Sequence, residues 1–261
     1  MKSRLESTEW LAAMARLVQS NDVDSAAAAL ADAIDAAVEH EGTCLLAFHR
    51  DAPPEVFHHT LEPAGRRHYV DRYVAGPYLL DPLYLLAVSD EKPGVCRFRD
   101  ESPDRFRSSE YYRQYCERTH LRDEMDFLVD VSGNSTLVLV VGRRTRRFSK
   151  AELQRLKLVE PLVHAAMQSI WRRSSASTRR QDQGDSLHQR LTRCFDNFGA
   201  GLLTEREREI TQLLLRGHST KSVARELGIA PGTVMVHKRN LFAKLGITSQ
   251  YELFSLLIDA L

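Results

Sequence analysis

The stretch 202–261 limits what this chain can fold into more than any other, because its apolar positions and its helix-boundary residues agree with one another. Thr204 is suited to be a helix N-cap, and Glu207 stands at the matching capping-box position. Ser219 is suited to be a second N-cap. Glycines follow the apolar runs at positions 217, 228 and 246. This spacing predicts four helices, and the tight turn between the second and the third is typical of a helix-turn-helix.

The third of these helices, over 231–245, is expected to carry the contacts to DNA. One of its stripes should be buried, at Val234, Leu241 and Leu245. Three side chains lie away from that stripe and can enter a major groove, namely Met235, Val236 and Arg239. The Arg239 guanidinium can donate two hydrogen bonds to a guanine edge, which discriminates between bases by roughly 1–3 kcal/mol.

Further residues can hold the DNA backbone, which fixes the register without reading the sequence. Suitable hydroxyl and ammonium groups are those of Ser219, Thr220, Thr233, Lys221, Lys238 and Lys244. His237 lies at the margin of the buried stripe, where we expect it to pack and to donate one N–H to a phosphate. Asn240 completes the predicted DNA-binding set.

This pattern resembles the LuxR-type helix-turn-helix family. The matching residues are Leu203-Thr204, Arg206-Glu207, Glu209, Gly217, Ser219, Lys221, Ala224, Leu227, Ile229, Thr233-Val234, His237, Asn240-Leu241 and Lys244-Leu245-Gly246. The resemblance implies transcription regulation by a homodimer on paired half-sites of double-stranded DNA, with the fourth helix at the dimer contact. Met235 stands where family members often carry Lys, so Arg239 is expected to carry more of the base readout.

Residues 1–171 are predicted to be an α+β domain, an antiparallel sheet flanked by helices as in PAS and GAF domains. Strands are expected over 43–49, 55–61, 124–131 and 136–142, the last two as a hairpin. Helices are expected over 7–40, 65–75, 102–120 and 149–171, and a short one opened by Asp81 and Pro82. The helix over 149–171 has more apolar surface than one sheet needs, which indicates a homodimer contact.

The predicted domains are therefore 1–171, a basic linker over 172–201 and the helix-turn-helix over 202–261. Within the linker, residues 185–198 can form a short amphipathic helix. Acidic residues are in excess before residue 172 and basic residues after it, as expected for nucleic-acid contact at one end only.

An aromatic-rich stretch around one acid is a candidate small-molecule pocket. It contains Tyr69, Tyr73, Tyr78, Asp81 and Tyr84. The stretch resembles the autoinducer-binding domains of quorum-sensing LuxR-type regulators, which carry an aromatic pair four residues apart and then Asp-Pro. That resemblance implies that Asp81 accepts an N–H from a ligand.

Departures from that pattern change the expected ligand. The interval from Tyr73 to Asp81 is eight residues rather than nine, and Tyr69 replaces the expected Trp. A second Trp is missing downstream. A small effector other than an acyl-homoserine lactone is at least as good an expectation. Alternatively, Asp81 only opens a helix and the tyrosines belong to the core.

Several function classes are disfavoured. There is no Gly-x-Ser-x-Gly, no phosphate-binding loop and no His/Asp cluster at metal-ligand spacing, so we expect neither an enzyme nor a cofactor or metal. No stretch is apolar enough to span a membrane and the start lacks a secretory pattern, which favours a cytoplasmic protein. The remaining alternative is an orphan regulator whose N-terminal domain only dimerises or binds a protein partner.

Overall fold

The computed structural model describes residues 4–177 and 187–260. The chain divides into two compact units. Unit 1 comprises Met1–Asp71, Leu86–Glu101 and His120–Gly184, and unit 2 comprises Arg72–Leu85, Ser102–Thr119 and Asp185–Leu261.

Unit 1 is built on an antiparallel sheet of five strands in the order β2-β1-β5-β4-β3. The strands are β1 (Gly42–His49), β2 (Glu55–His59), β3 (Val95–Arg97), β4 (Asp123–Ser132) and β5 (Ser135–Arg143). The tight turn between Ser132 and Ser135 confirms the predicted hairpin, and β1 pairs with β5 along its whole length. Only β3 was missed, because three residues are too few to show an alternating pattern.

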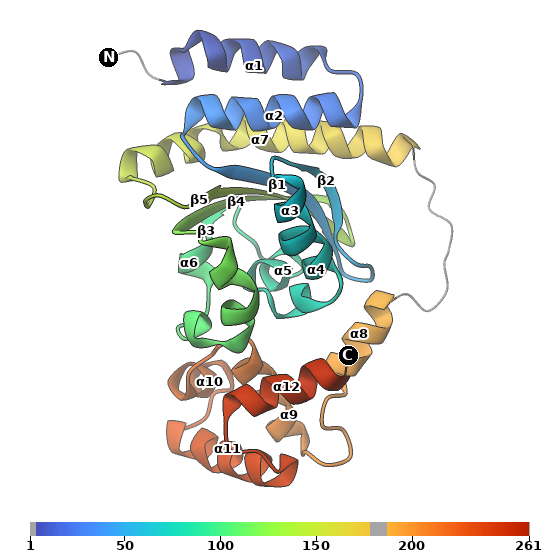
Figure 1. The fold of residues 1–261 in the computed structure, drawn as a ribbon, viewed down its shortest axis with the longest axis vertical. Helices are drawn as coiled ribbons and strands as arrows, with labels where there is room; N and C mark the ends of the chain where they lie inside the picture. Colours follow the sequence, from blue (N-terminus) through green and yellow to red (C-terminus); the bar gives the residue numbers. More distant parts are fainter. Residues whose placement is uncertain (1–3, 178–186, 261) are drawn as a thin grey trace. The chain divides into compact units, whose positions relative to one another are not determined.

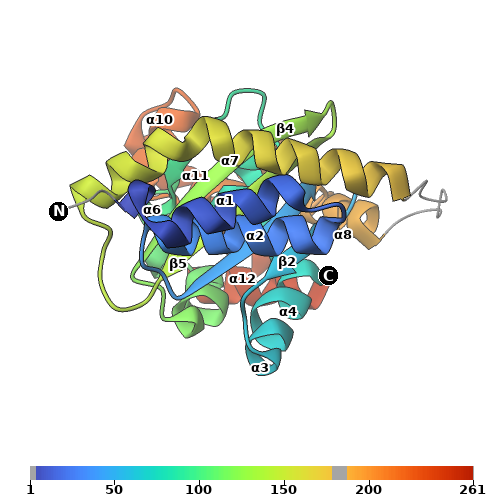
Figure 2. The same cartoon turned by 90° about the horizontal axis from the view of Figure 1, so that it is seen from above.

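Three long helices of unit 1 lie on one side of this sheet: α1 (Thr8–Gln19), α2 (Val23–Ala37) and α7 (Lys150–Ser177). Figure 1 shows α2 and α7 next to the sheet and α1 outside α2, and Figure 2 shows the three helices running alongside one another. The short helices α3 (Pro63–Arg66) and α6 (Phe98–Glu101) also belong to this unit. The structure thus confirms the α+β class.

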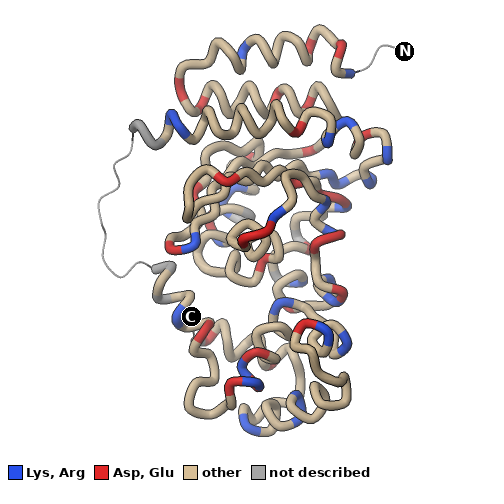
Figure 3. The backbone as a smooth tube through the Cα atoms, turned by 180° about the vertical axis from the view of Figure 1, so that it is seen from behind, with Lys and Arg blue, Asp and Glu red and all other residues tan. Residues whose placement is uncertain are grey.

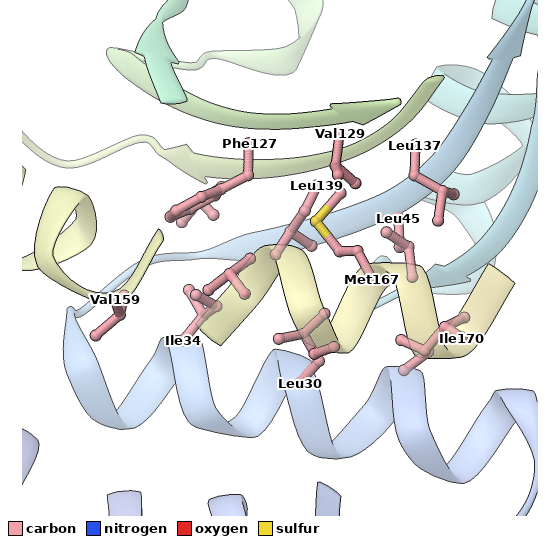
Figure 4. Close-up of a cluster of buried hydrophobic side chains, with 14 of the residues drawn as sticks. Leu30, Ile34, Leu45, Phe127, Val129, Leu137, Leu139, Val159, Met167 and Ile170 are labelled. Carbon is pink, nitrogen blue, oxygen red and sulfur yellow. The ribbon is translucent and has the colours of Figure 1, made fainter. Parts of the chain in front are cut away.

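The core of unit 1 lies between the sheet and the helices α2 and α7 (Figure 4). Alternate residues of the central strands point into it, as at Phe127 and Val129 of β4. From the helices come Leu30 and Ile34 of α2 and Met167 of α7, each at most 2% exposed. The predicted strand and helix periodicities therefore meet in one apolar layer.

Two predicted helices are interrupted, each at a serine or aspartate whose side chain competes for backbone groups. The expected helix over 7–40 is two helices, because Ser20 is extended and Asp22 caps α2 by accepting a hydrogen bond from Ser25 N–H at 2.8 Å. The prediction of one helix over 102–120 is wrong. In its place are short 3₁₀ or π-helical turns at Phe106–Ser108, Tyr112–Cys116 and Glu117–Thr119.

The reason for that second interruption is Ser109, which is buried and extended. Its Oγ donates to the Phe106 carbonyl at 2.7 Å and accepts from Tyr112 N–H at 3.1 Å. The hydroxyl thereby ends one turn and caps the next. The region over 65–75 also departs from one regular helix, since a π-helical turn at Arg67–Asp71 separates α3 from α4 (Arg72–Val74).

Unit 2 contains the C-terminal helices, whose boundaries agree closely with the sequence prediction. They are α8 (Leu187–Asp196), α9 (Glu205–Leu215), α10 (Thr220–Glu226), α11 (Pro231–Leu245) and α12 (Gln250–Ala260). The 3₁₀ turn Pro77–Leu80 also lies in this unit, and α5 (Pro82–Ala87) follows it. The predicted linker falls partly outside the described residues, and its described part begins as the end of α7.

Candidate DNA-binding face and aromatic cluster

Helices α9, α10 and α11 form a helix-turn-helix whose boundaries are set by local hydrogen bonds. Thr204 and Glu207 make the predicted capping box, and Ser219 Oγ accepts from Ser222 N–H at 3.1 Å. Gly246 ends α11 in the left-handed conformation with φ 68°. These caps position the exposed face of α11 on a packed support made by Ile210, Val223, Val234 and Leu241, none of which is exposed to solvent.

The exposed face of α11 carries the three residues expected to reach base edges. Met235 is 64% and Val236 47% exposed, and Arg239 is exposed as well. Thr233 and Asn240 are exposed at either end of this face, whereas His237 is half-buried at its margin. Large apolar side chains that are exposed next to an exposed arginine are typical of a contact surface.

The three lysines expected to contact phosphates have different surroundings. Lys221 is exposed. Lys238 is half-buried, with its Nζ 5.3 Å from the centre of the Phe242 ring, and burial together with the nearby Arg105 lowers its pKa. Lys244 Nζ donates to the Glu207 carboxylate at 2.6 Å, so a phosphate contact there would have to share the ammonium with Glu207. Basic and acidic positions are interspersed through the C-terminal helices (Figure 3).

Ser219 at the start of α10 already has a partner that the sequence does not indicate. Its backbone N–H donates to Oδ1 of Asp104 at 2.9 Å, and its hydroxyl donates to Oδ2 at 2.5 Å. Asp104 lies in Ser102–Thr119, which belongs to the same compact unit as α10. The two residues are 115 positions apart in sequence, so no local pattern could have predicted their contact.

Four of the five predicted ligand contacts come together in unit 2. Tyr73 Oη donates to Asp81 Oδ2 at 2.7 Å, and its ring centre is 6.1 Å from that of Tyr78. Tyr78 meets Tyr84 edge to face, with ring centres 5.0 Å apart. The side chain of Tyr69, the fifth, lies outside what the structure describes. The aromatic cluster below means Tyr73, Tyr78, Asp81 and Tyr84.

Asp81 is buried, and it also begins a helix, as the alternative interpretation of its role predicted. Its Oδ1 accepts from Leu83 N–H at 2.9 Å and so begins α5. Burial raises the pKa of Asp81 to about 6, against the opposing effect of hydrogen bonds from Tyr73, Leu83 N–H and Tyr111. Tyr111, which the sequence reasoning missed, lies on the segment that also carries Asp104.

The described residues contain neither a membrane-spanning helix nor a metal site. Within 4–177 and 187–260, no helix is long and apolar enough to cross a bilayer. In the same part of the chain, no group of three or more His, Cys, Asp and Glu side chains could hold a metal ion.

Known proteins resemble both parts of the chain. Residues 201–257 match the family described as bacterial regulatory proteins, luxR family. An HTH-type transcriptional regulator from the exeN 3' region of Aeromonas salmonicida is 35% identical over 157 residues, which cover 58% of this chain and 80% of that protein. The monoamine regulon transcriptional regulator of Klebsiella aerogenes is 28% identical over 208 residues, covering 78% of this chain and 77% of that protein.

Among solved structures, the VqsR LBD domain from Pseudomonas aeruginosa matches the fold of the N-terminal region. The match has a TM-score of 0.57 at 24% sequence identity and covers 64% of this chain and 99% of that one. This match shows a shared fold. The two relatives named above are transcriptional regulators, and the aligned residues cover most of the length of each.

Proposed function

Because the chain belongs to the luxR family of bacterial regulatory proteins, we propose that it reads promoter DNA with the exposed face of α11 as one subunit of a homodimer. It is a transcriptional regulator with a C-terminal helix-turn-helix and an N-terminal domain of the ligand-binding type. We also propose that a small effector controls this regulator and that it acts in the cytoplasm. The exposure of Met235, Val236 and Arg239 on a helix that is anchored by the buried Val234 and Leu241 carries the proposed DNA contact.

In this proposal the exposed face of α11 enters the major groove and α10 lies across the phosphate backbone. Arg239 reads a base edge, and Met235 and Val236 offer apolar contact suited to a thymine methyl group. Ser219, Thr220, Lys221 and Thr233 hold phosphates and carry no sequence information. His237, Lys238, Asn240 and Lys244 flank this set.

Replacing Arg239 with Ala tests the base contact. We expect binding to a promoter site selected by the wild-type protein to fall roughly 10-fold or more, the size of one lost bidentate contact, with a much smaller loss on random duplex. Lys221→Ala is the matched control, since loss of a phosphate contact weakens both duplexes alike. Equal losses for Arg239→Ala on both duplexes would remove its role as a base reader.

For the N-terminal domain we propose control by a small effector with an N–H group that Asp81 can accept. The support is the aromatic cluster with its single buried carboxylate, together with the fold match to the VqsR LBD domain. A thermal-shift screen of the full chain against a metabolite library tests it. A hit that loses its effect with Tyr73→Phe and Asp81→Asn supports the effector, and the absence of any hit favours the orphan regulator.

A further inference from the structure

Residues 104–106 contact the helix-turn-helix through three hydrogen bonds. Asp104 accepts from the N–H and the hydroxyl of Ser219, and Arg105 N–H donates to the Gly217 carbonyl at 3.0 Å. We call residues 104–106 the clamp segment. All of these residues lie in the same compact unit.

The contact is close enough to depend on a glycine. Gly217 has φ +94°, and a Cβ placed there would lie 2.8 Å from Phe106 Cα and 3.1 Å from Phe106 N. Phe106 itself is only 3% exposed. The clamp segment is therefore packed against the turn between α9 and α10, and does not merely touch it.

The clamp segment also occupies the hydrogen-bond donors of Ser219 that a DNA phosphate would need. Ser219 is among the proposed phosphate contacts, and both its N–H and its hydroxyl are bonded to the Asp104 carboxylate. Burial opposes ionisation of Asp104, but the hydrogen bonds from Ser219 and the nearby His218 outweigh it and lower the pKa of Asp104 below its usual value. An ionised carboxylate and a DNA phosphate cannot both occupy the Ser219 donors, and their like charges repel each other.

The same stretch of chain reaches the aromatic cluster. The Phe106 ring centre is 5.9 Å from that of Tyr111, and the Tyr111 hydroxyl is hydrogen-bonded to Asp81. A line of contacts thus runs from Asp81 through Tyr111 to Phe106 of the clamp segment. This is a physical connection between the proposed effector contacts and the proposed DNA contacts.

From these contacts we propose that the clamp segment is an autoinhibitory element, in which Asp104 holds Ser219 and must release it before α10 can bind a DNA phosphate. The proposal rests on the proposed function, because it needs Ser219 to be a phosphate contact. It adds a way in which the N-terminal part of the chain lowers DNA affinity.

The test is DNA binding by the full chain carrying Asp104→Ala, measured by fluorescence anisotropy with a labelled random-sequence duplex at low salt. Random duplex suffices because phosphate contacts do not read sequence. We expect Asp104→Ala to bind roughly 3-fold to 10-fold more tightly than wild type, since one charge-assisted contact is lost from the closed arrangement. Glu101→Ala is the matched control, because it removes the same charge from an exposed position of unit 1.

A gain in DNA affinity for Asp104→Ala that clearly exceeds the gain for Glu101→Ala supports the proposed autoinhibition. DNA binding by folded Asp104→Ala that is equal to or weaker than that of wild type overturns it. If Asp104→Ala fails to fold by circular dichroism, Asp104→Asn replaces it, with the same expectation at smaller size. In a Ser219→Ala background the gain should shrink, and an undiminished gain would overturn an action through Ser219. If wild type and all variants leave the duplex unbound, the proposed function itself fails, a result distinct from failure of the clamp alone.

Discussion

At the residue scale, Asp81 has a structural role in addition to the effector contact that we propose for it. It begins α5, accepts hydroxyl hydrogen bonds from Tyr73 and Tyr111, and is buried. These bonds explain why an acid is tolerated there, but they do not fully offset the cost of burying its charge.

The pKa of Asp81, raised from 3.8 to about 6, predicts a pH effect with a definite sign. Because the folded protein binds this proton more tightly than the unfolded chain does, the contribution of Asp81 to the free energy of unfolding falls as the pH rises from about 4 to about 6. Over that window wild type should lose roughly 2 kcal/mol relative to Asp81→Asn, which cannot titrate, out of roughly 3 kcal/mol for the complete titration.

Urea unfolding of both proteins at pH 4.5 and 6.5 measures this difference. Taking the difference between the two proteins cancels the carboxylates whose pKa is lowered, such as Glu207, which act in the opposite direction. A difference that does not change with pH would show that Asp81 does not titrate in this window.

At the element scale, the two sides of α11 should have separate roles. Leu241 is unexposed and supports the helix, whereas Met235 is 64% exposed and faces outward. Leu241→Ala should cost about 2–5 kcal/mol of unfolding free energy, and Met235→Ala less than about 0.5 kcal/mol.

Two probes can separate this effect by unit. Both tryptophans, Trp10 and Trp171, lie in unit 1, so their fluorescence follows that unit, while far-UV circular dichroism follows all helices. Leu241→Ala should lower the dichroism midpoint in urea and leave the fluorescence midpoint in place. A comparable loss for Met235→Ala would contradict the assignment of the two sides.

Elements whose ends are fixed by neighbouring residues could be predicted from sequence. Thr204, Ser219 and Gly246 bound the helices where expected, and Ser149 with Glu152 begins α7 by the same chemistry. The aromatic cluster was also predictable as a group, because all four of its members lie within one short stretch.

Features that depend on distant partners could not be predicted in this way. The 102–120 region reads as helical by periodicity, yet the buried Ser109 divides it into turns. The hydrogen bonds of Asp104 to Ser219 and of Tyr111 to Asp81 join segments far apart in sequence. Lys244 was expected to be free for a phosphate, but a carboxylate 37 residues away holds it.

At the scale of the whole molecule, the surface of α7 indicates how two copies could associate. Leu158 is 71% and Leu162 37% exposed on a helix whose other side is in the core. Association through this stripe would bury side chains that are costly to leave in water.

Leu158→Asp tests this interface by placing a charge in it. In sedimentation velocity at micromolar concentration we expect the wild-type chain to be a dimer, and the variant to dissociate with a Kd raised at least about 10-fold, as for a buried unpaired charge. Lys157→Asp, at an exposed position beside the stripe, should leave the dimer intact. A monomeric wild type, or equal behaviour of the two variants, would argue against α7 as the interface.

The central claim is that DNA lies against α10 and the exposed face of α11. The most direct measurement is the change in backbone amide NMR shifts of the full chain on adding a promoter duplex. We expect the largest changes at residues 219–221 and 233–240, with the core helix α9 little affected. Large changes confined to other helices, with these two stretches unmoved by a bound duplex, would contradict it.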